Sequence, residues 1–251
     1  MALQEDMRRQ GNWLFKYRGI LPIIILVIGL SLYLLKETSP KTILGEGTVQ
    51  ELIYNFTCLA IGFLGLFIRI HVVGHAASNT SGKNTQEQKA DSVNSTGIYS
   101  IVRHPLYLGN FLMWLAPALL VADPWFIIIF ILAYWLYYER IIYAEEAFMR
   151  EKFGENYLIW ANTVPTFIPN FANYKKPTLP FNWRKAIRSE KNSFAALTLI
   201  FCLFDISAQV VSGRYNFNYV FMSLSALTLI GYFVIKLLIK STKIFDLTKV
   251  E

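Results

Sequence analysis

Six long runs of apolar residues follow one another along the chain, and most of the charged residues lie between them. The runs cover residues 20–35, 52–68, 107–122, 124–138, 194–211 and 217–238. A helix needs about 20 mostly apolar residues to cross the hydrocarbon core of a bilayer, with about 17 as a minimum. The first, second, fifth and sixth runs reach this length with their flanks. The third and fourth are shorter and meet at Asp123-Pro124, which predicts a tight helical hairpin.

The bulk composition agrees with a membrane protein. Hydrophobic residues make up 54% of the 251 residues and the mean hydropathy is +0.38, whereas a soluble domain has about 45–50% apolar residues and scatters its charges. The pattern therefore predicts an all-α integral membrane protein with about six transmembrane helices. No small-residue cleavage site follows the charged residues 1–18, so we expect the first span to be retained.

The basic residues predict the orientation of these spans. With six crossings and both termini in the cytoplasm, all but three of the 24 Lys and Arg residues fall on the cytoplasmic side, as the positive-inside rule requires. The exceptions are Lys36, Lys41 and Arg214. The net charge of +7 is then largely a result of topology, so no nucleic-acid partner is expected. A basic cytoplasmic face instead attracts the anionic lipids of the bilayer. No obligate protein partner is inferred.

Polar segments divide the chain into three parts. Residues 1–48 form a cytoplasmic segment and the first span, 49–170 a core unit, and 171–251 a basic cytoplasmic loop with a terminal transmembrane hairpin. Within them, Ser, Thr, Asn, Gln and Gly are frequent in 76–94, which predicts a mobile loop. Residues 170–192 hold six Lys and Arg, and their prolines are expected to break any long helix.

Arg103-His104-Pro105 directly precedes the third run. Pro105 suits the first position of a helix, where its missing N–H costs nothing. The N–H groups of the first helical turn, together with the Arg103 guanidinium, would form an anion site at the cytoplasmic face. The alternative is that Arg103 and His104 are anchoring side chains that reach lipid headgroups. The neighbouring Tyr99 and Tyr107 favour a site over an anchor.

Acidic residues follow the fourth run. Glu139, Tyr143 and Glu146 have the spacing of one helical face, and Glu145 adjoins them. Ionisable groups at the end of a span are costly and are usually paired or functional, although an ion-pair face at the interface would also explain them. The hairpin returns this end to the depth of Arg103. One site would then offer anion donors and carboxylates together, which suits a zwitterion that carries a sulfonium.

Other polar residues in the spans have simpler expectations. His71 and His75 are one helical turn apart, but no third ligand accompanies them, so no metal site is predicted. With Arg69 they are expected to anchor the second span or to contact substrate. Asp205 lies within the fifth run and is expected to hydrogen-bond to Gln209 one turn later rather than to relay protons.

Five motifs occur in one order over residues 50–170: Gly97-Ile98-Tyr99, Arg103-His104-Pro105-Leu106-Tyr107-Leu108-Gly109, Glu145-Glu146, Phe153-Gly154-Glu155-Asn156-Tyr157 and Val164-Pro165-Thr166-Phe167-Ile168-Pro169. Together they resemble the isoprenylcysteine carboxyl methyltransferase and phospholipid methyltransferase superfamily, which would make 49–170 a methyltransferase core. The resemblance implies a membrane enzyme that binds S-adenosylmethionine at its cytoplasmic face. It implies that the cofactor is contacted by Arg103, His104, Tyr107, Glu145 and Glu146, of which we expect Arg103, His104 and Glu146 to be catalytic.

Within the superfamily, residues 11–18 and the basic loop with the two terminal spans are similar to bacterial lipid A 1-phosphate O-methyltransferases. This narrower resemblance implies O-methylation of a membrane lipid, the 1-phosphate of lipid A, from the cytoplasmic face of a bacterial inner membrane. A face rich in Lys and Arg suits a phosphorylated headgroup, and the expected substrate contacts are Tyr99, Arg69, Lys175, Lys176 and Arg184. The alternatives are carboxyl methylation of an isoprenylcysteine-like substrate and N-methylation of a phospholipid.

Two rival interpretations belong to other classes. A sterol-reductase-like enzyme shares an Arg-His-Pro-x-Tyr motif but uses NADPH, and the Leu-Gly-Asn continuation and the Glu-Glu pair favour a methyltransferase instead. The non-enzymatic alternative is a membrane scaffold or a small transporter. Against this alternative, Asp205 is the only acid expected in the middle of a span, and no polar partners in other spans accompany it. For a methyltransferase, a phosphate or carboxylate acceptor is already an anionic nucleophile, whereas an amine acceptor would need a general base.

Overall fold

The computed structural model describes residues 2–38, 48–77, 80, 88 and 90–245. Eight α-helices occur there: α1 (Leu3–Lys16), α2 (Ile20–Glu37), α3 (Val49–His75), α4 (Pro105–Leu120), α5 (Pro124–Phe153), α6 (Glu155–Thr163), α7 (Trp183–Val211) and α8 (Tyr219–Ser241), with the short 3-10 helices η1 (Ile98–Ser100) and η2 (Phe171–Asn173). Much of the predicted loop 76–94, and Lys41, lie outside the described residues.

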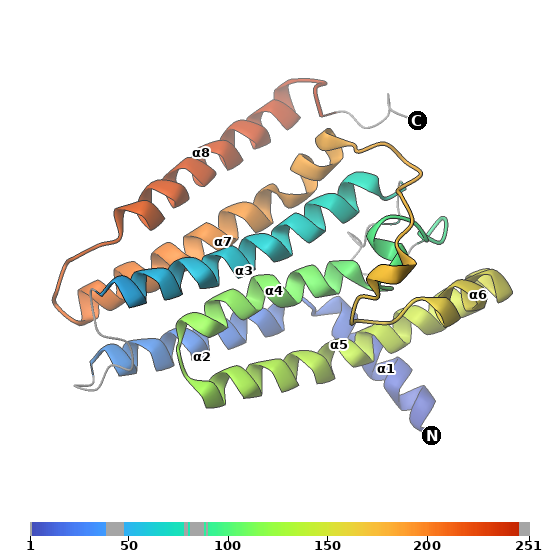
Figure 1. The fold of residues 1–251 in the computed structure, drawn as a ribbon, viewed down its shortest axis with the longest axis horizontal. Coiled ribbons are helices and arrows are strands. Elements are labelled where there is room, and N and C mark those ends of the chain that lie inside the picture. The colour runs from blue at the N-terminus through green and yellow to red at the C-terminus, as the bar shows by residue number, and fades with distance from the viewer. Residues whose placement is uncertain (1, 39–47, 78–79, 81–87, 89, 246–251) are drawn as a thin grey trace.

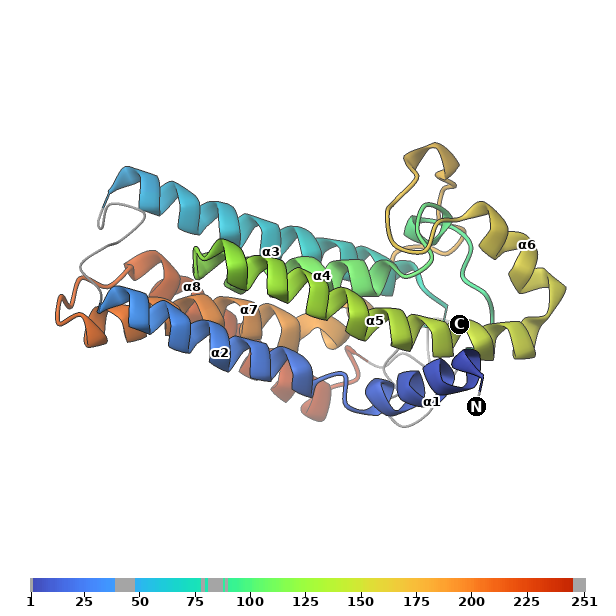
Figure 2. The same cartoon turned by 90° about the horizontal axis from the view of Figure 1, so that it is seen from below.

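Six of these helices form an elongated bundle. α2, α3, α4, α5, α7 and α8 run roughly along one axis, and α1, α6 and the segments that hold η1 and η2 gather at one end (Figure 1, Figure 2). Among the described residues, α3, α5, α7 and α8 are long and apolar enough to cross a membrane, and α4 is a shorter apolar helix. The predicted all-helical class is thus confirmed and four of the described helices are candidate membrane spans, while six crossings and cytoplasmic termini stay predictions.

The turn between α4 and α5 is the predicted tight hairpin. Asp123, the residue before α5, accepts a hydrogen bond at Oδ1 from Phe126 N at 2.9 Å. Its Oδ2 lies 3.1 Å from Lys36 Nζ of α2, and Lys36 also donates to the carbonyl oxygens of Val121 and Ala122. The pKa of Asp123 lies below its usual value, firstly because the carboxylate accepts the Phe126 N–H and secondly because it accepts a hydrogen bond from Lys36. A charged carboxylate therefore caps α5 and fastens the hairpin to α2.

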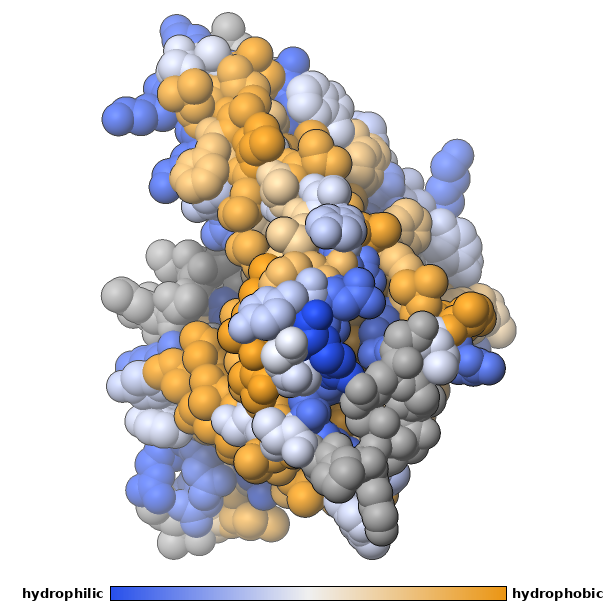
Figure 3. Space-filling model, turned by 90° about the vertical axis from the view of Figure 1, so that its left-hand side faces the viewer, coloured by the Kyte–Doolittle hydropathy of each residue, from blue (hydrophilic) through white to orange (hydrophobic). Residues whose placement is uncertain are grey.

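The next residue of α2 fastens the other hairpin at the same end of the bundle. Glu37 forms an ion pair with Arg214, which lies in the turn between α7 and α8. Figure 3 shows this end of the molecule, where a hydrophilic cluster is surrounded by hydrophobic side chains. Two adjacent residues of opposite charge, Lys36 and Glu37, thus hold two different turns against the end of α2.

The α7–α8 turn also explains the acid within the fifth run. Asp205 Oδ2 accepts a hydrogen bond from Asn218 N at 2.8 Å, and Gln209 Oε1 accepts one from Asn216 N at 3.1 Å. Each side chain caps the turn, in place of the predicted bond between Asp205 and Gln209. The reason is that the chain folds back beside α7 and offers each of them a main-chain N–H.

α3 and α4 approach each other backbone to backbone. A Cβ added at Gly65 would lie 2.5 Å from Gly109 O, and one added at Gly109 would lie 2.8 Å from Gly65 O. Glycine allows this approach, and close van der Waals packing is a main source of helix association in a membrane. The same contact brings Gly109 against the stem of Arg69. The register between α3 and α4 therefore decides which part of α4 lies beside Arg69.

The predicted basic loop 170–192 is helical in its second half, where α7 begins. Asn182 caps this helix by accepting a hydrogen bond from Lys185 N at 3.0 Å. The buried Lys185 side chain donates to the carbonyl oxygens of Ala76 and Ala77, just beyond α3. α7 therefore begins well before its apolar run, and Lys185 of this polar first part finds partners at the end of α3.

A buried ion pair joins α3 to α7. Arg69 donates from Nε and Nη2 to the two carboxylate oxygens of Glu190, both at 2.8 Å, and from Nη1 to Asn110 of α4. Glu190 is 3% exposed, so each charge depends on the other for neutralisation. Arg69, a predicted substrate contact, is therefore held between three helices.

We expect Gly65→Ala to lower the free energy of unfolding by roughly 1–3 kcal/mol, because its Cβ would press on the backbone of α4. Gly231→Ala is the matched control, since a Cβ there meets nothing within 4 Å and alanine favours a helix. Unfolding of both variants in detergent measures the effect. Equal midpoints for the two variants would contradict a close α3–α4 contact.

Glu190→Gln should lower the free energy of unfolding by about 3 kcal/mol, because Arg69 would remain charged in a buried place without its counter-ion. The control is Glu151→Gln, which removes only the exposed ion pair with Arg8 and should leave the midpoint near that of the wild type. The same detergent unfolding assay compares them. A Glu190 variant as stable as the Glu151 variant would show that the buried pair does not hold α7.

Candidate active site

Main-chain hydrogen bonds join residues 97–103 to residues 165–175. The first segment leads into α4 and the second follows α6. The N–H groups of Gly97, Asn170 and Arg103 donate to the carbonyl oxygens of Lys175, Ile101 and Pro165, at 2.8, 2.9 and 2.9 Å. Gly97 has a φ of +63°, a conformation that glycine adopts without the steric cost of a side chain. These hydrogen bonds fix Arg103 just before α4, which begins at Pro105 as predicted.

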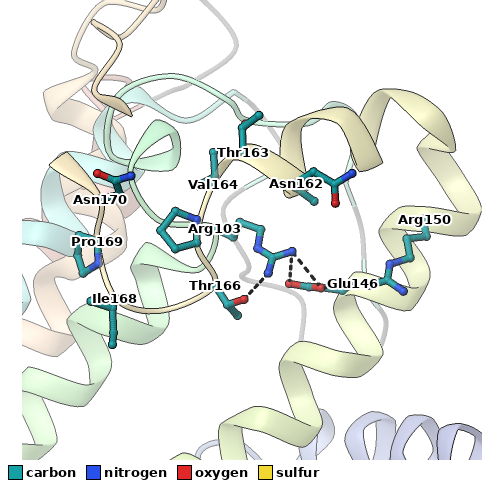
Figure 4. A pocket seen from close by; sticks show the side chains of 12 residues that line it. Arg103, Glu146, Arg150, Asn162, Thr163, Val164, Thr166, Ile168, Pro169 and Asn170 are labelled. Atoms are coloured by element: carbon teal, nitrogen blue, oxygen red, sulfur yellow. Dashed lines mark hydrogen bonds and ion pairs between the residues drawn. The ribbon is translucent and has the colours of Figure 1, made fainter. Parts of the chain in front are cut away.

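The Arg103 side chain reaches both α5 and the segment after α6. Its Nη1 lies 3.2 Å from Glu146 Oε1, and its Nη2 donates to Thr166 Oγ1. Figure 4 shows these side chains at an open depression of about 910 Å³, with Arg150 on its far side. Arg103 Nε is buried and has no hydrogen-bond partner within the described part of the chain. The Arg103 guanidinium thus lines the depression while Glu146 and Thr166 hold it.

His104 stands between the two acids of α5. Its Nε2 lies 3.2 Å from Glu146 Oε1, and its Nδ1 lies 3.7 Å from Glu145 Oε2. Tyr107, in the first turn of α4, donates from its hydroxyl to Glu145 Oε1 at 2.6 Å. The structure therefore brings the predicted residues Arg103, His104, Tyr107, Glu145 and Glu146 into one network across the α4–α5 hairpin.

The two carboxylates have different surroundings. Glu146 is 8% exposed and faces two guanidiniums, including that of Arg150 at 3.6 Å, together with His104. Glu145 instead accepts the hydroxyl of Tyr107. Adjacent residues point about 100° apart around a helix, so the pair divides the site. We call these parts the Glu146 side, at the depression, and the Glu145 side, at Tyr107.

Three residues of this region were not among the predicted site residues. Tyr157 of α6 is 2% exposed, and burial raises its pKa far above the usual value, so its phenol is neutral at neutral pH. Thr166 belongs to one of the five sequence motifs, but the sequence predicted no contact with cofactor or substrate for it. Arg150 lies four residues after Glu146 on one helix, a spacing that could have indicated the pair.

The predicted substrate residues do not all converge. For Tyr99, burial first and the charge of Glu145 second raise the pKa of the phenol. The side chains of Lys175 and Lys176 are exposed, and Arg184 lies over the ring of the adjacent tryptophan. Over the described ranges, the hydrogen bonds and ion pairs of the network include none of these last three side chains.

Comparisons with known proteins cover the segment that carries this network. Residues 52–156 match the family model described as phospholipid methyltransferase. The protein-S-isoprenylcysteine O-methyltransferase of Xenopus laevis is 32% identical over 134 residues, which are 49% of this chain and 46% of that protein. The enzyme of the same name from Saccharomyces cerevisiae is 33% identical over 115 residues, 45% of this chain and 47% of that protein.

The matched part spans less than half of the length of each of these relatives. The human protein-S-isoprenylcysteine O-methyltransferase is similar too, at 27% identity over 121 residues, 46% of this chain and 43% of that protein. No solved structure gives a significant match. The family model and the named relatives thus support the predicted kinship with the isoprenylcysteine carboxyl methyltransferase and phospholipid methyltransferase superfamily, over the segment that holds Arg103, His104, Glu145 and Glu146.

Proposed function

We propose that this chain is an S-adenosylmethionine-dependent methyltransferase that modifies an anionic oxygen of a lipophilic acceptor in the membrane. The observation that carries the proposal is the meeting of Arg103 and His104 with Glu145 and Glu146 at one end of an apolar bundle. The relatives named above are O-methyltransferases, which supports the same class of reaction.

The charges of the network fit the cofactor. S-adenosylmethionine carries a carboxylate, an ammonium, a sulfonium and ribose hydroxyls, so its site needs a guanidinium and carboxylates within a few ångströms of each other. Arg103, which lines the depression, would hold the carboxylate. Glu145 and Glu146 would accept from the ammonium and the ribose hydroxyls. The depression beside Arg103, about 910 Å³, is of the size that small-molecule sites have.

The side chains would act mainly by positioning. When bound, S-adenosylmethionine supplies a methyl group on a positively charged sulfonium. Arg103 is itself oriented by Glu146 and Thr166, and Tyr107 orients Glu145, so neither charge needs to reorganise as the reaction proceeds. Transfer to an anionic oxygen then depends mainly on holding the acceptor in line with the methyl group. Such an acceptor needs no general base, and His104 would serve as one only for an amine.

A prenylated cysteine carboxylate is the acceptor that the relatives favour, since each is named for isoprenylcysteine O-methylation. The 1-phosphate of lipid A in a bacterial inner membrane is the second candidate. It is supported by the basic segment that includes Lys175, Lys176 and Arg184, because phosphate headgroups are held by Lys and Arg. Both acceptors combine an apolar body with an anionic oxygen.

Arg103→Ala and Glu146→Ala should each weaken S-adenosylmethionine binding about tenfold to a hundredfold, because each removes a charged hydrogen-bond partner of the cofactor. Glu139→Ala is the control, since Glu139 is on the same helix but pairs only with the adjacent Arg140 in the described chain. Calorimetry with the purified protein in detergent measures the dissociation constants. Undiminished binding in both site variants would rule out this site, and binding of NADPH instead would favour the reductase alternative.

Purified protein supplied with methyl-labelled S-adenosylmethionine should transfer the label to S-farnesyl-N-acetylcysteine, as a base-labile methyl ester. Parallel reactions with lipid A and with phosphatidylethanolamine test the phosphate and amine acceptors, and mass spectrometry identifies the methylated atom. Glu146→Ala should be inactive in every reaction. Cofactor binding without transfer to any of the three acceptors would show that the acceptor class is wrong.

A further inference from the structure

Basic side chains gather at one end of the α7–α8 hairpin. Two contacts set the register of its helices: Thr198 Oγ1 lies 2.6 Å from Thr228 Oγ1, and Ser225 Oγ donates to Thr198 O at 2.8 Å. Lys191 lies seven residues before Thr198, and Lys236 lies eight residues after Thr228. Because the two helices run in opposite directions, both lysines are about two turns from this contact, toward the same end of the hairpin.

A third cation, Arg188, is held at this end of the hairpin. Its Nη1 donates to Phe245 O, a few residues beyond α8, at 3.2 Å. The Phe245 side chain is buried, and its ring centroid lies 6.0 Å from that of Trp183 at the start of α7. Lys191 Nζ in turn donates to Arg188 O at 2.8 Å. The chain beyond α8 therefore stays against the first part of α7, with the basic side chains between this contact and the threonine pair.

Over the described residues, none of these three charges is balanced by an acid. Arg188 and Lys191 donate to main-chain carbonyl oxygens, and Lys236 lies over the aromatic ring one turn before it. Glu190, the acid between Arg188 and Lys191 in the sequence, is bound by Arg69 of α3. Three cations thus share one end of the hairpin without a carboxylate, an arrangement that a bound anion would stabilise.

Exposed apolar side chains adjoin the cations on both helices. Ile187 and Phe194 are exposed and lie one turn before and one turn after Lys191 on α7. Phe233 is exposed too and lies one turn before Lys236 on α8. α8 packs mainly on α7, and both helices are candidate membrane spans. Cations at the end of an exposed apolar surface match the two parts of a lipid, its charged headgroup and its acyl chains.

We propose that Arg188, Lys191 and Lys236 bind the phosphate of an anionic phospholipid, whose acyl chains lie along the exposed apolar surface of α8. The guanidinium would donate to the phosphate oxygens, and the two ammonium groups would add positive charge around them. This end of the hairpin is at the end of the bundle that holds the candidate active site, but α8 and α5 lie on opposite edges of the bundle (Figure 1). The phospholipid is therefore a ligand of the hairpin and not the methyl acceptor, so this site does not depend on the proposed function.

The test compares phosphatidylglycerol with phosphatidylcholine of the same acyl chains, each added to the purified full-length protein in detergent. Native mass spectrometry counts the lipids that stay bound. The wild type should retain one phosphatidylglycerol at about a tenfold lower concentration than phosphatidylcholine, because only the first lipid carries a net negative charge. Millimolar inorganic phosphate should not displace it, because a free phosphate has no acyl chains to bind the apolar surface.

Lys191→Gln and Lys236→Gln should each weaken phosphatidylglycerol binding about fivefold, the effect of one basic residue on an anionic lipid. Each should leave phosphatidylcholine binding within twofold of the wild type. Lys236 is exposed, so its variant is expected to fold even if the Lys191 variant does not. Lys236→Arg should keep the preference. Arg9→Gln, which removes an exposed charge on α1, is the control for net charge and should bind both lipids as the wild type does.

Three results would overturn the proposal. Equal retention of the two lipids by the wild type, or an equal loss in Arg9→Gln and Lys236→Gln, would leave only a general attraction between a basic protein and anionic lipids. A full preference in Lys236→Gln would place the bound lipid elsewhere. Displacement by inorganic phosphate would indicate an anion site that needs no membrane lipid. Cofactor binding is not involved in any of these measurements, so a failure of the proposed function would leave them unchanged.

Discussion

The ion pair between Arg103 and Glu146 is the contact around which the site is organised. It joins the residue before α4 to a residue far along α5, and it is formed where both helices leave the apolar part of the bundle. At the opposite end of the same hairpin, Asp123 binds Lys36. If α4 and α5 slid past each other, the Arg103 and Glu146 charges would separate where both side chains are largely buried. The register that brings His104 between Glu145 and Glu146 is thereby fixed.

The other helices support this hairpin by a second buried pair. Arg69 of α3 binds Glu190 of α7 and Asn110 of α4 at once, and the contact of Gly65 with Gly109 keeps α3 close enough for this to happen. A residue that could have contacted a substrate is thus used to hold three helices together. The guanidiniums of Arg103 and Arg150 both face Glu146, whereas Glu145 accepts the Tyr107 hydroxyl, so the two acids of α5 have different partners.

Much of this arrangement could be predicted from the chain. The apolar runs and Asp123-Pro124 predicted the helices and the hairpin, because helix length and proline position depend on local sequence. The meeting of Arg103 and His104 with Glu145 and Glu146 followed from the hairpin, since a short turn returns the chain to the same depth. The start of α7 was harder, because Asn182 and the buried Lys185 make a polar stretch helical through contacts with the end of α3.

The sequence by itself determined the helical class, the order of the apolar helices and the grouping of charges at their ends. The tertiary structure alone decided which charge meets which. Glu190 and Arg69 are 121 positions apart and Arg103 and Thr166 are 63 positions apart, so no local spacing could have paired them. A buried charge pairs with the opposite charge that helix packing places beside it. That packing depends on the sizes of residues throughout the bundle, including the absence of a side chain at Gly65 and Gly109.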